Sequence, residues 1–355
     1  MASERRKKLV LTAVSALVTL LFAEAALRIA GVGAAGQGSP WFAGGNHPRL
    51  LFQPDTASGY TLRPGFHGRQ VAPRREFDVA TVVDRRGLRD HPHTAPAAPS
   101  VLAIGDSMTF GEGVPVEQTY SAVLEKTSGV RVYNGGVPGY GSRQMLGRLE
   151  KLLPQVRPSL VTEAVSPLWD AQRCATPFVY KEGYIVAQGY VDRLYLVGDN
   201  LYSAETKLPL LGPATAYLKG RSNLMRLALP ALAGGARRAL GGKQEAPVPD
   251  PRPSAEALSE AHRKAESAGA DFLVILLDGD SRGEAYRQAR AALEGELQAR
   301  GIPFISLDRL LPKADWPRLR YAQDGHWNAD GHRAVGTALA PRVLRYSRTS
   351  RRGDV

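Results

Sequence analysis

The sequence predicts a three-layer α/β/α protein with a mostly parallel β-sheet, preceded by an N-terminal membrane helix and a small β-rich extension. From residue 100 onward, short apolar segments alternate with longer amphipathic ones, which is typical of strands alternating with helices. Before that point, one long apolar run is followed by short extended pieces that Pro, Gly and His interrupt. The 355 residues are 43% hydrophobic and 23% charged, which excludes wholesale disorder and a multi-span membrane protein.

The N-terminal segment is predicted to be a membrane anchor. Residues 1–8 form a basic tail, and the span 9–31 begins with an apolar run whose single charge is Glu24. Such a run spans a bilayer, and positive charge ahead of it favours a cytoplasmic N-terminus. We therefore expect a single-pass protein of the inner (cytoplasmic) membrane with its main domain on the extracytoplasmic side. The alternative is a cleaved signal peptide, because Ala23-Glu24-Ala25 loosely matches a cleavage site, and it would also export the domain.

Residues 32–98 are predicted to form a linker and the β-rich extension. The stretch 31–36 matches Gly-x-Gly-x-x-Gly, but it follows a membrane helix and not a strand, so it is expected to be a linker. His91 and His93 stand in a Pro-rich loop, and we expect them to be solvated and to bind no metal. Cys174 is the single cysteine, so an internal disulfide and a cysteine-type zinc cluster are excluded.

The main domain is expected at 99–345, with an insertion at 178–253 and a basic C-terminal tail at 346–355. The expected strands are 101–104, 130–133, 160–165, 272–277 and 303–307. The expected helices are 117–126, 142–153, 255–268, 284–300 and one that begins at 329. Within the insertion we expect a hairpin at 178–186 that turns at 181–183, an amphipathic helix at 222–232 and a loop at 241–254. Ligands of such a sheet bind beyond the carboxyl ends of its strands.

Two of these strand ends carry candidate catalytic groups. The first expected strand leads into Gly-Asp-Ser-Met-Thr-Phe-Gly at 105–111, which places Ser107 in a turn at the carboxyl edge of the sheet. A serine there can act as a nucleophile, and its own N–H can face a reacting carbonyl; alone, it would more often cap a helix. The second strand leads into a glycine-rich turn at 134–141, where Gly139 can donate an N–H to an oxyanion.

A third segment, 324–332, precedes the last helix and supplies a base. A serine hydroxyl needs a base, and the base needs a carboxylate to orient it. Asp324 and His326 offer both from one loop. A lone histidine would more often be structural, so the combination of the three segments carries the prediction.

With these three segments, residues 99–344 resemble the SGNH (GDSL-like) hydrolases. The stretch Asp-Arg-Arg-Gly-Leu-Arg-Asp at 84–90 resembles the lead-in of membrane-anchored bacterial members. The resemblance implies a flavodoxin-like α/β/α fold and an esterase, lipase or carbohydrate deacetylase activity. It also implies that Ser107 is the nucleophile and that the backbone N–H groups of Ser107 and Gly139 are oxyanion donors.

The last block of the family carries the base and its carboxylate, and the resemblance places these roles on His326 and Asp324. The family usually has Asp-x-x-His, whereas this chain has Gln323 at the first position and an Asp-x-His spacing similar to alginate-type O-acetyltransferases. In a further block, Trp169 stands before Asp170, where the family normally has an oxyanion-binding Asn before the Asp. Loss of one donor costs about 10²- to 10³-fold in rate. We expect Trp169 and Asp170 to contact the substrate.

The sequence thus predicts an exported serine esterase that hydrolyses an O-acyl ester on an envelope glycan or a related small molecule, without metal or organic cofactor. Two alternatives remain: an O-acyltransferase that uses the same residues on a sugar hydroxyl, and a catalytically impaired glycan-binding or scaffolding protein. Nucleic-acid binding is not expected, because the net charge of +12 lies partly in the two tails and no nucleic-acid motif occurs. The C-terminal tail contributes Arg348, Arg351 and Arg352, beside Arg345.

Overall fold

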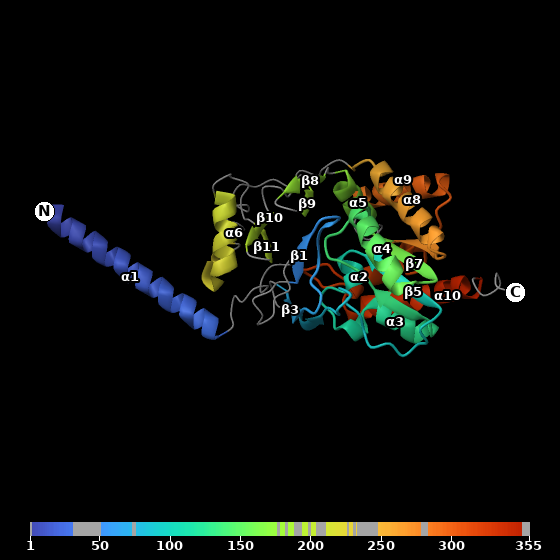
Figure 1. The fold of residues 1–355 in the computed structure, drawn as a ribbon, viewed down its shortest axis with the longest axis horizontal. Coiled ribbons are helices and arrows are strands. Elements are labelled where there is room, and N and C mark those ends of the chain that lie inside the picture. The colour runs from blue at the N-terminus through green and yellow to red at the C-terminus, as the bar shows by residue number, and fades with distance from the viewer. Residues whose placement is uncertain are drawn as a thin grey trace.

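A computed structural model of the protein contains an α/β body and a long helix, α1, that projects from it (Figure 1). The structure describes residues 2–30, 51–72, 76–175, 178–181, 184–187, 194–197, 200–203, 211–225, 227–229, 232, 248–277 and 283–349. The predicted linker at 31–36, the hairpin turn at 182–183, most of the loop at 241–254 and residues 350–355 lie outside this part of the chain.

A five-stranded parallel sheet forms the centre of the body. Its strands lie in the order β13-β12-β7-β5-β6. They are β5 (Ser100–Gly105), β6 (Arg131–Asn134), β7 (Leu160–Val165), β12 (Asp271–Leu276) and β13 (Phe304–Ser306). Each lies where the sequence predicts a strand. Because β6 and β7 pair with opposite sides of β5, the strand order reverses there, and a crevice is expected at the carboxyl end of β5.

Helices cover both faces of this sheet, as the sequence predicts. One core layer lies between the sheet and α4 (Ser142–Val156), α8 (Arg252–Ser267) and α9 (Glu284–Ala299). The opposite layer lies under α3 (Tyr120–Ser128) and α10 (Ala329–Thr349). The three-layer α/β/α class is therefore confirmed. The last helix continues four residues past the boundary expected at 345.

The segment before the sheet contains two antiparallel hairpins, which confirms the β-rich extension. They are β1–β2 and β3–β4, with strands Phe52–Asp55, Gly59–Leu62, His67–Val71 and Asp78–Val82. The insertion contains the predicted hairpin, β8–β9 (Phe178–Lys181 and Tyr184–Ala187). It also contains elements that the sequence did not predict: a second hairpin, β10–β11 (Leu194–Val197 and Asn200–Ser203), and the helix α6 (Leu211–Arg221). Residues 223–225 and 227–229, inside the helix predicted at 222–232, are helical.

The N-terminal helix α1 (Ala2–Ile29) is apolar and makes no buried contact along its most hydrophobic window. Among the residues that the structure describes, it is the one helix long and apolar enough to cross a membrane. This finding is compatible with a membrane anchor and with a signal sequence alike.

Candidate active site

The nucleophile candidate sits at the end of the central strand. β5 is buried over its whole length and ends at Gly105, and Asp106 then caps the short helix α2 (Ser107–Phe110) by accepting a 2.9 Å hydrogen bond from Met108 N. Gly111 ends this turn in a left-handed conformation. Ser107 is therefore the first residue of α2, held at the carboxyl edge of the sheet as the sequence predicts.

The glycine-rich turn after β6 packs directly against α2. A Cβ atom at Gly136 would lie 2.3 Å from the backbone nitrogen of Phe110, so only glycine permits this approach. Gly139 has a φ of +83°, a conformation that also favours glycine. The Asn134 side chain ties the two loops together by donating to Thr109 O at 2.8 Å and accepting from Gly136 N.

The third segment closes on itself ahead of α10. Tyr321 N donates to His326 O at 2.9 Å, and Gly325 N donates to Tyr321 O at 3.0 Å. This compact loop projects two side chains, those of Asp324 and His326, toward the nucleophile.

The structure brings the three predicted catalytic side chains into one chain of hydrogen bonds. His326 Nε2 lies 2.7 Å from Ser107 Oγ, and His326 Nδ1 is hydrogen-bonded to Asp324 Oδ1. Burial favours the neutral imidazole, but the carboxylates of Glu112 and Asp324 outweigh it and raise the pKa of His326 above its ordinary value. Although burial opposes it, the bond from His326 lowers the pKa of Asp324, which keeps this carboxylate ionised. A base oriented by a carboxylate is thus within reach of a hydroxyl.

Glu112 is a further acidic group at this site, and the sequence did not predict it. Its Oε2 lies 3.7 Å from His326 Nε2, and its side chain is buried. Burial, with the charges of Asp324 and Asp106, raises the pKa of Glu112 to about 7. The signal available was the acidic residue between two glycines, directly after the nucleophile turn.

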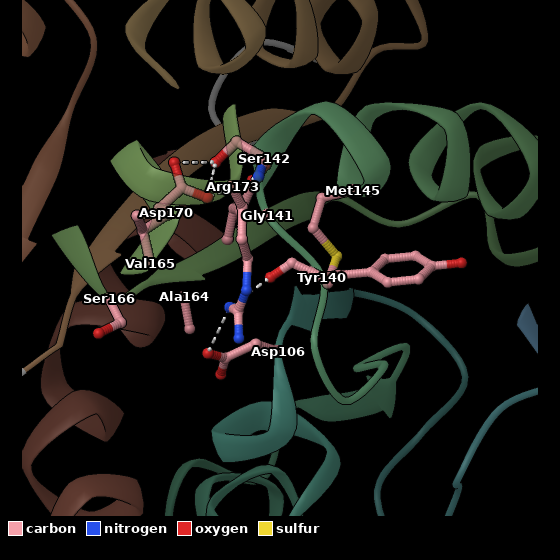
Figure 2. A pocket seen from close by; sticks show the side chains of 11 residues that line it. Asp106, Tyr140, Gly141, Ser142, Met145, Ala164, Val165, Ser166, Asp170 and Arg173 are labelled. Atoms are coloured by element: carbon pink, nitrogen blue, oxygen red, sulfur yellow. Dashed lines mark hydrogen bonds and ion pairs between the residues drawn. The ribbon is translucent and has the colours of Figure 1, made fainter. Parts of the chain in front are cut away.

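A pocket opens beside the nucleophile turn, between the sheet edge and the helices that follow it (Figure 2). It is a small cavity of about 10 Å³, which is the room that one water molecule needs. The residues that line it are Asp106, Tyr140, Gly141, Ser142, Met145, Glu163, Ala164, Val165, Ser166, Asp170 and Arg173. Burial and the nearby Asp170 raise the pKa of Glu163 to about 8, so it is protonated at neutral pH.

The two predicted substrate-binding residues occupy different places. Both belong to α5 (Pro167–Cys174). Asp170 lines the pocket, where it accepts hydrogen bonds from Ser142 N and Oγ at the start of α4. Trp169 is 44% exposed and is not among the lining residues. A substrate contact by either residue stays a prediction.

Arg173, one turn after Trp169 on α5, reaches the pocket instead. Its side chain passes against Gly141, and its Nη1 donates to Tyr140 O at 3.0 Å and lies 3.6 Å from Asp106 Oδ2 (Figure 2). Asp106 precedes Ser107, and Tyr140 follows Gly139. The guanidinium therefore lies between the two loops that carry the predicted backbone donors.

The β-rich extension and its lead-in brace these loops. Glu76 accepts hydrogen bonds from Gln323 N at 3.0 Å and Asp324 N at 2.8 Å. The fully buried Arg89, from the lead-in at 84–90, donates to Phe110 O at 2.8 Å and to other carbonyls of the nucleophile loop. The extension thus contributes to the geometry of the site.

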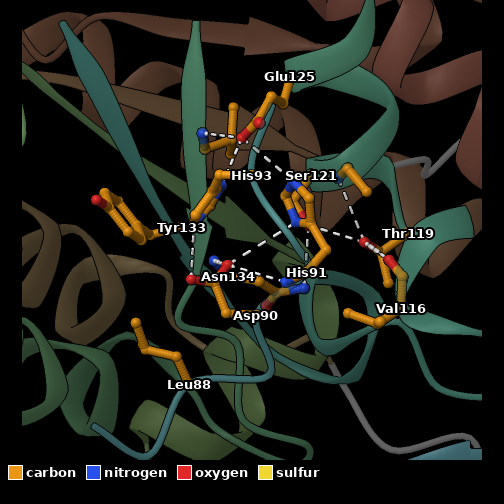
Figure 3. A network of polar contacts seen from close by, with 12 residues as sticks. Leu88, Asp90, His91, His93, Val116, Thr119, Ser121, Glu125, Tyr133 and Asn134 are labelled. Atoms are coloured by element: carbon orange, nitrogen blue, oxygen red, sulfur yellow. Dashed lines mark hydrogen bonds and ion pairs between the residues drawn. The ribbon is translucent and has the colours of Figure 1, made fainter. Parts of the chain in front are cut away.

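Of the two histidines predicted to be solvated, His91 is buried and His93 is partly buried, so that prediction was wrong. Glu125 Oε2 contacts His93 Nδ1 at 2.7 Å and His91 Nε2 at 3.2 Å, and His93 Nε2 contacts Asp90 Oδ2 at 2.9 Å (Figure 3). Three possible ligand atoms, one each from Asp90, His91 and His93, lie within 4.8 Å of one another. Both ring nitrogens of His93 already have carboxylate partners. Arg86 Nη2 lies 3.1 Å from Asp90 Oδ2, so this carboxylate also has a cationic partner. The cluster thus connects the lead-in to α3 by hydrogen bonds and ion pairs.

Comparisons with known proteins give fold-level similarity only. No family model matches the chain, and no curated protein matches it. A solved protein of the lipolytic G-D-S-L family from Desulfitobacterium hafniense DCB-2 is similar at 15% identity and a TM-score of 0.41, covering 68% of this chain and 98% of that one. A lipase/acylhydrolase from Enterococcus faecalis is similar at 15% identity and a TM-score of 0.38, covering 69% and 96%. A catalytic mutant of an acetylxylan esterase from Geobacillus stearothermophilus is similar at 14% identity and a TM-score of 0.37, covering 70% and 94%.

Proposed function

We propose that this protein is an SGNH-type serine esterase that hydrolyses small O-acyl esters. The observation that carries the proposal is the hydrogen-bonded series of Ser107, His326 and Asp324 at the carboxyl edge of a parallel sheet. We further propose that α1 anchors the enzyme in the inner membrane with the domain on the extracytoplasmic side. An acyl group on an envelope glycan is then a substrate within reach.

The reaction follows from the positions of these atoms. Ser107 Oγ attacks the ester carbonyl while His326 Nε2 takes its proton, and the charge of Asp324 stabilises the imidazolium. The tetrahedral intermediate collapses, the alcohol leaves with the proton from His326, and an acyl-Ser107 remains. Water then attacks this acyl group with His326 as base, which releases the acid and restores the serine.

The oxyanion of each intermediate requires donors aimed at it. We assign this role to the backbone N–H groups of Ser107 and Gly139, as the sequence predicts, and to the guanidinium of Arg173. Arg173 lies between the segments that carry those N–H groups, and among the described residues it makes one hydrogen bond, to Tyr140 O. A guanidinium has five N–H donors, so donors remain for a ligand.

Hydrolysis of p-nitrophenyl acetate tests the proposal. The protein, purified in detergent, is expected to release p-nitrophenol, and the Ser107→Ala variant is expected to lose this activity down to the uncatalysed background. Equal turnover by the two proteins would overturn the role of Ser107. An inert wild-type protein would favour the binding or scaffolding alternative.

A further inference from the structure

The insertion between β7 and α8 carries an apolar and basic surface close to the end of α1. α6 packs on the hairpin β10–β11. Three of its large apolar side chains are nevertheless exposed: Leu211 at 54%, Tyr217 at 52% and Leu218 at 42%. Leu211 and Leu218 are two helical turns apart and therefore share one face. Clusters of large exposed apolar side chains of this kind mark an interaction surface.

Two leucines that follow α6 in the chain, Leu227 and Leu232, are also exposed, the latter at 70%. In the sequence, residues 211–232 contain no Asp or Glu and three basic residues, Lys219, Arg221 and Arg226. The Arg221 guanidinium lies 5.2 Å from the ring centroid of Tyr217, so a cation and an aromatic ring meet on this surface. Apolar and aromatic residues combined with unopposed positive charge are typical of segments that lie in a membrane interface.

The last turns of α1 hold this surface in place. Glu24 accepts hydrogen bonds from Ser222 Oγ at 2.8 Å, Asn223 N at 3.0 Å and Leu224 N at 2.9 Å. Arg28 donates to Arg221 O at 2.7 Å. The carboxylate thus accepts hydrogen bonds from backbone N–H groups at the start of the helical residues 223–225, as a helix-capping group does. These contacts place the insertion at the level where the apolar run of α1 ends, and Figure 1 shows α6 beside that end, away from the sheet.

We propose that the insertion 211–232 rests on the bilayer surface from which α1 emerges, with Tyr217 and the neighbouring leucines in the interface and the basic residues against anionic phospholipid headgroups. This inference rests on the proposed membrane anchoring by α1. It commits to a lipid bilayer because the most apolar window of α1 is unburied and α1 ends at this surface. The enzyme would then contact the membrane through both α1 and the insertion, and these two contacts would fix its orientation relative to the bilayer.

Fluorescence quenching in vesicles tests this inference with the full-length protein. The variants Leu17→Cys, Tyr217→Cys and Ala292→Cys are each labelled with an environment-sensitive dye. The native Cys174 stays in place, because it is buried and little reactive. Each protein is reconstituted into vesicles of phosphatidylcholine and phosphatidylglycerol, with and without spin-labelled lipid. Ala292 is the matched control, because it is exposed on α9, on the opposite side of the body from α1.

The expected result is strong quenching at positions 17 and 217, a blue-shifted emission at 217, and little quenching at 292. Vesicles of phosphatidylcholine alone are expected to reduce the quenching at 217, because the basic residues lose their anionic partners.

Quenching at 17 without quenching at 217 would overturn the inference and leave the anchor intact. No quenching at 17 would overturn the anchor and the inference with it. Unchanged quenching at 217 in the neutral vesicles would overturn the role of anionic lipid. Esterase activity is measured separately, so its loss would not affect these outcomes.

Discussion

Replacement of Arg173 by Gln is expected to slow the acylation of Ser107 while substrate binding stays nearly unchanged. Removal of one oxyanion donor costs about 10²- to 10³-fold in kcat, or about 2.7 to 4 kcal/mol. The side chain of Arg173 is 26% exposed, so water screens part of its charge, and the lower end of this range applies. We therefore expect kcat for p-nitrophenyl acetate to fall about 100-fold, which corresponds to about 2.7 kcal/mol. Steady-state kinetics that separate kcat from KM measure this effect.

The matched control is Arg143→Gln. Arg143 is exposed on α4 and donates to Cys174 O, so this variant loses the same charge close by without reaching the pocket. Its kcat is expected to stay within about twofold of the wild-type value, since an exposed charge contributes little. Arg173→Lys keeps the positive charge but loses the planar guanidinium, so its kcat is expected to lie between those of the wild type and Arg173→Gln. A wild-type kcat in Arg173→Gln, or an equal loss in both Gln variants, would refute the assignment.

Three further predictions concern neighbouring positions. Asp324→Asn is expected to lower kcat/KM by about 10⁴-fold, because the amide no longer holds the correct tautomer of His326, and stopped-time assays at high enzyme concentration would detect the residual rate. Glu112→Gln removes a charge that raises the pKa of His326, so the acidic limb of the kcat/KM profile is expected to move to lower pH; a shift to higher pH would contradict this. Gly136→Ala is expected to abolish activity, because its Cβ would clash with the nucleophile turn. The control is Gly295→Ala on α9, where an added Cβ would meet no neighbouring atom within 4 Å. This control is expected to raise the free energy of unfolding by about 0.5–1 kcal/mol in chemical denaturation.

The sheet and its flanking helices were predictable because their apolar residues follow the periods of buried strands and amphipathic helices. The catalytic series was predictable for a related reason. Ser107 follows a buried parallel strand, and Asp324 and His326 precede the last helix, so the topology brings them to one edge. The local sequence therefore indicated both the chemistry of these groups and the edge of the sheet at which they lie.

The rest depends on contacts between distant segments. Arg173 enters the pocket because Gly141, about thirty residues earlier in the chain, leaves room for its stem, and no local pattern encodes this. His91 and His93 are in a polar, Pro-rich stretch that is typical of an exposed loop, yet both rings contact Glu125 on α3, His91 in a buried place and His93 in a partly buried one. α6 was missed because its exposed apolar face gives no amphipathic pattern.

Labelling with a fluorophosphonate, followed by identification of the modified residue by peptide mass spectrometry, tests the central claim most directly. Such a probe reacts with a serine that a neighbouring base activates and leaves a tetrahedral adduct in place of the acylation intermediate. One adduct is expected, on Ser107, and its formation is expected to be lost in His326→Ala. A chain that stays unlabelled, or an adduct on another residue with Ser107 intact, would contradict it.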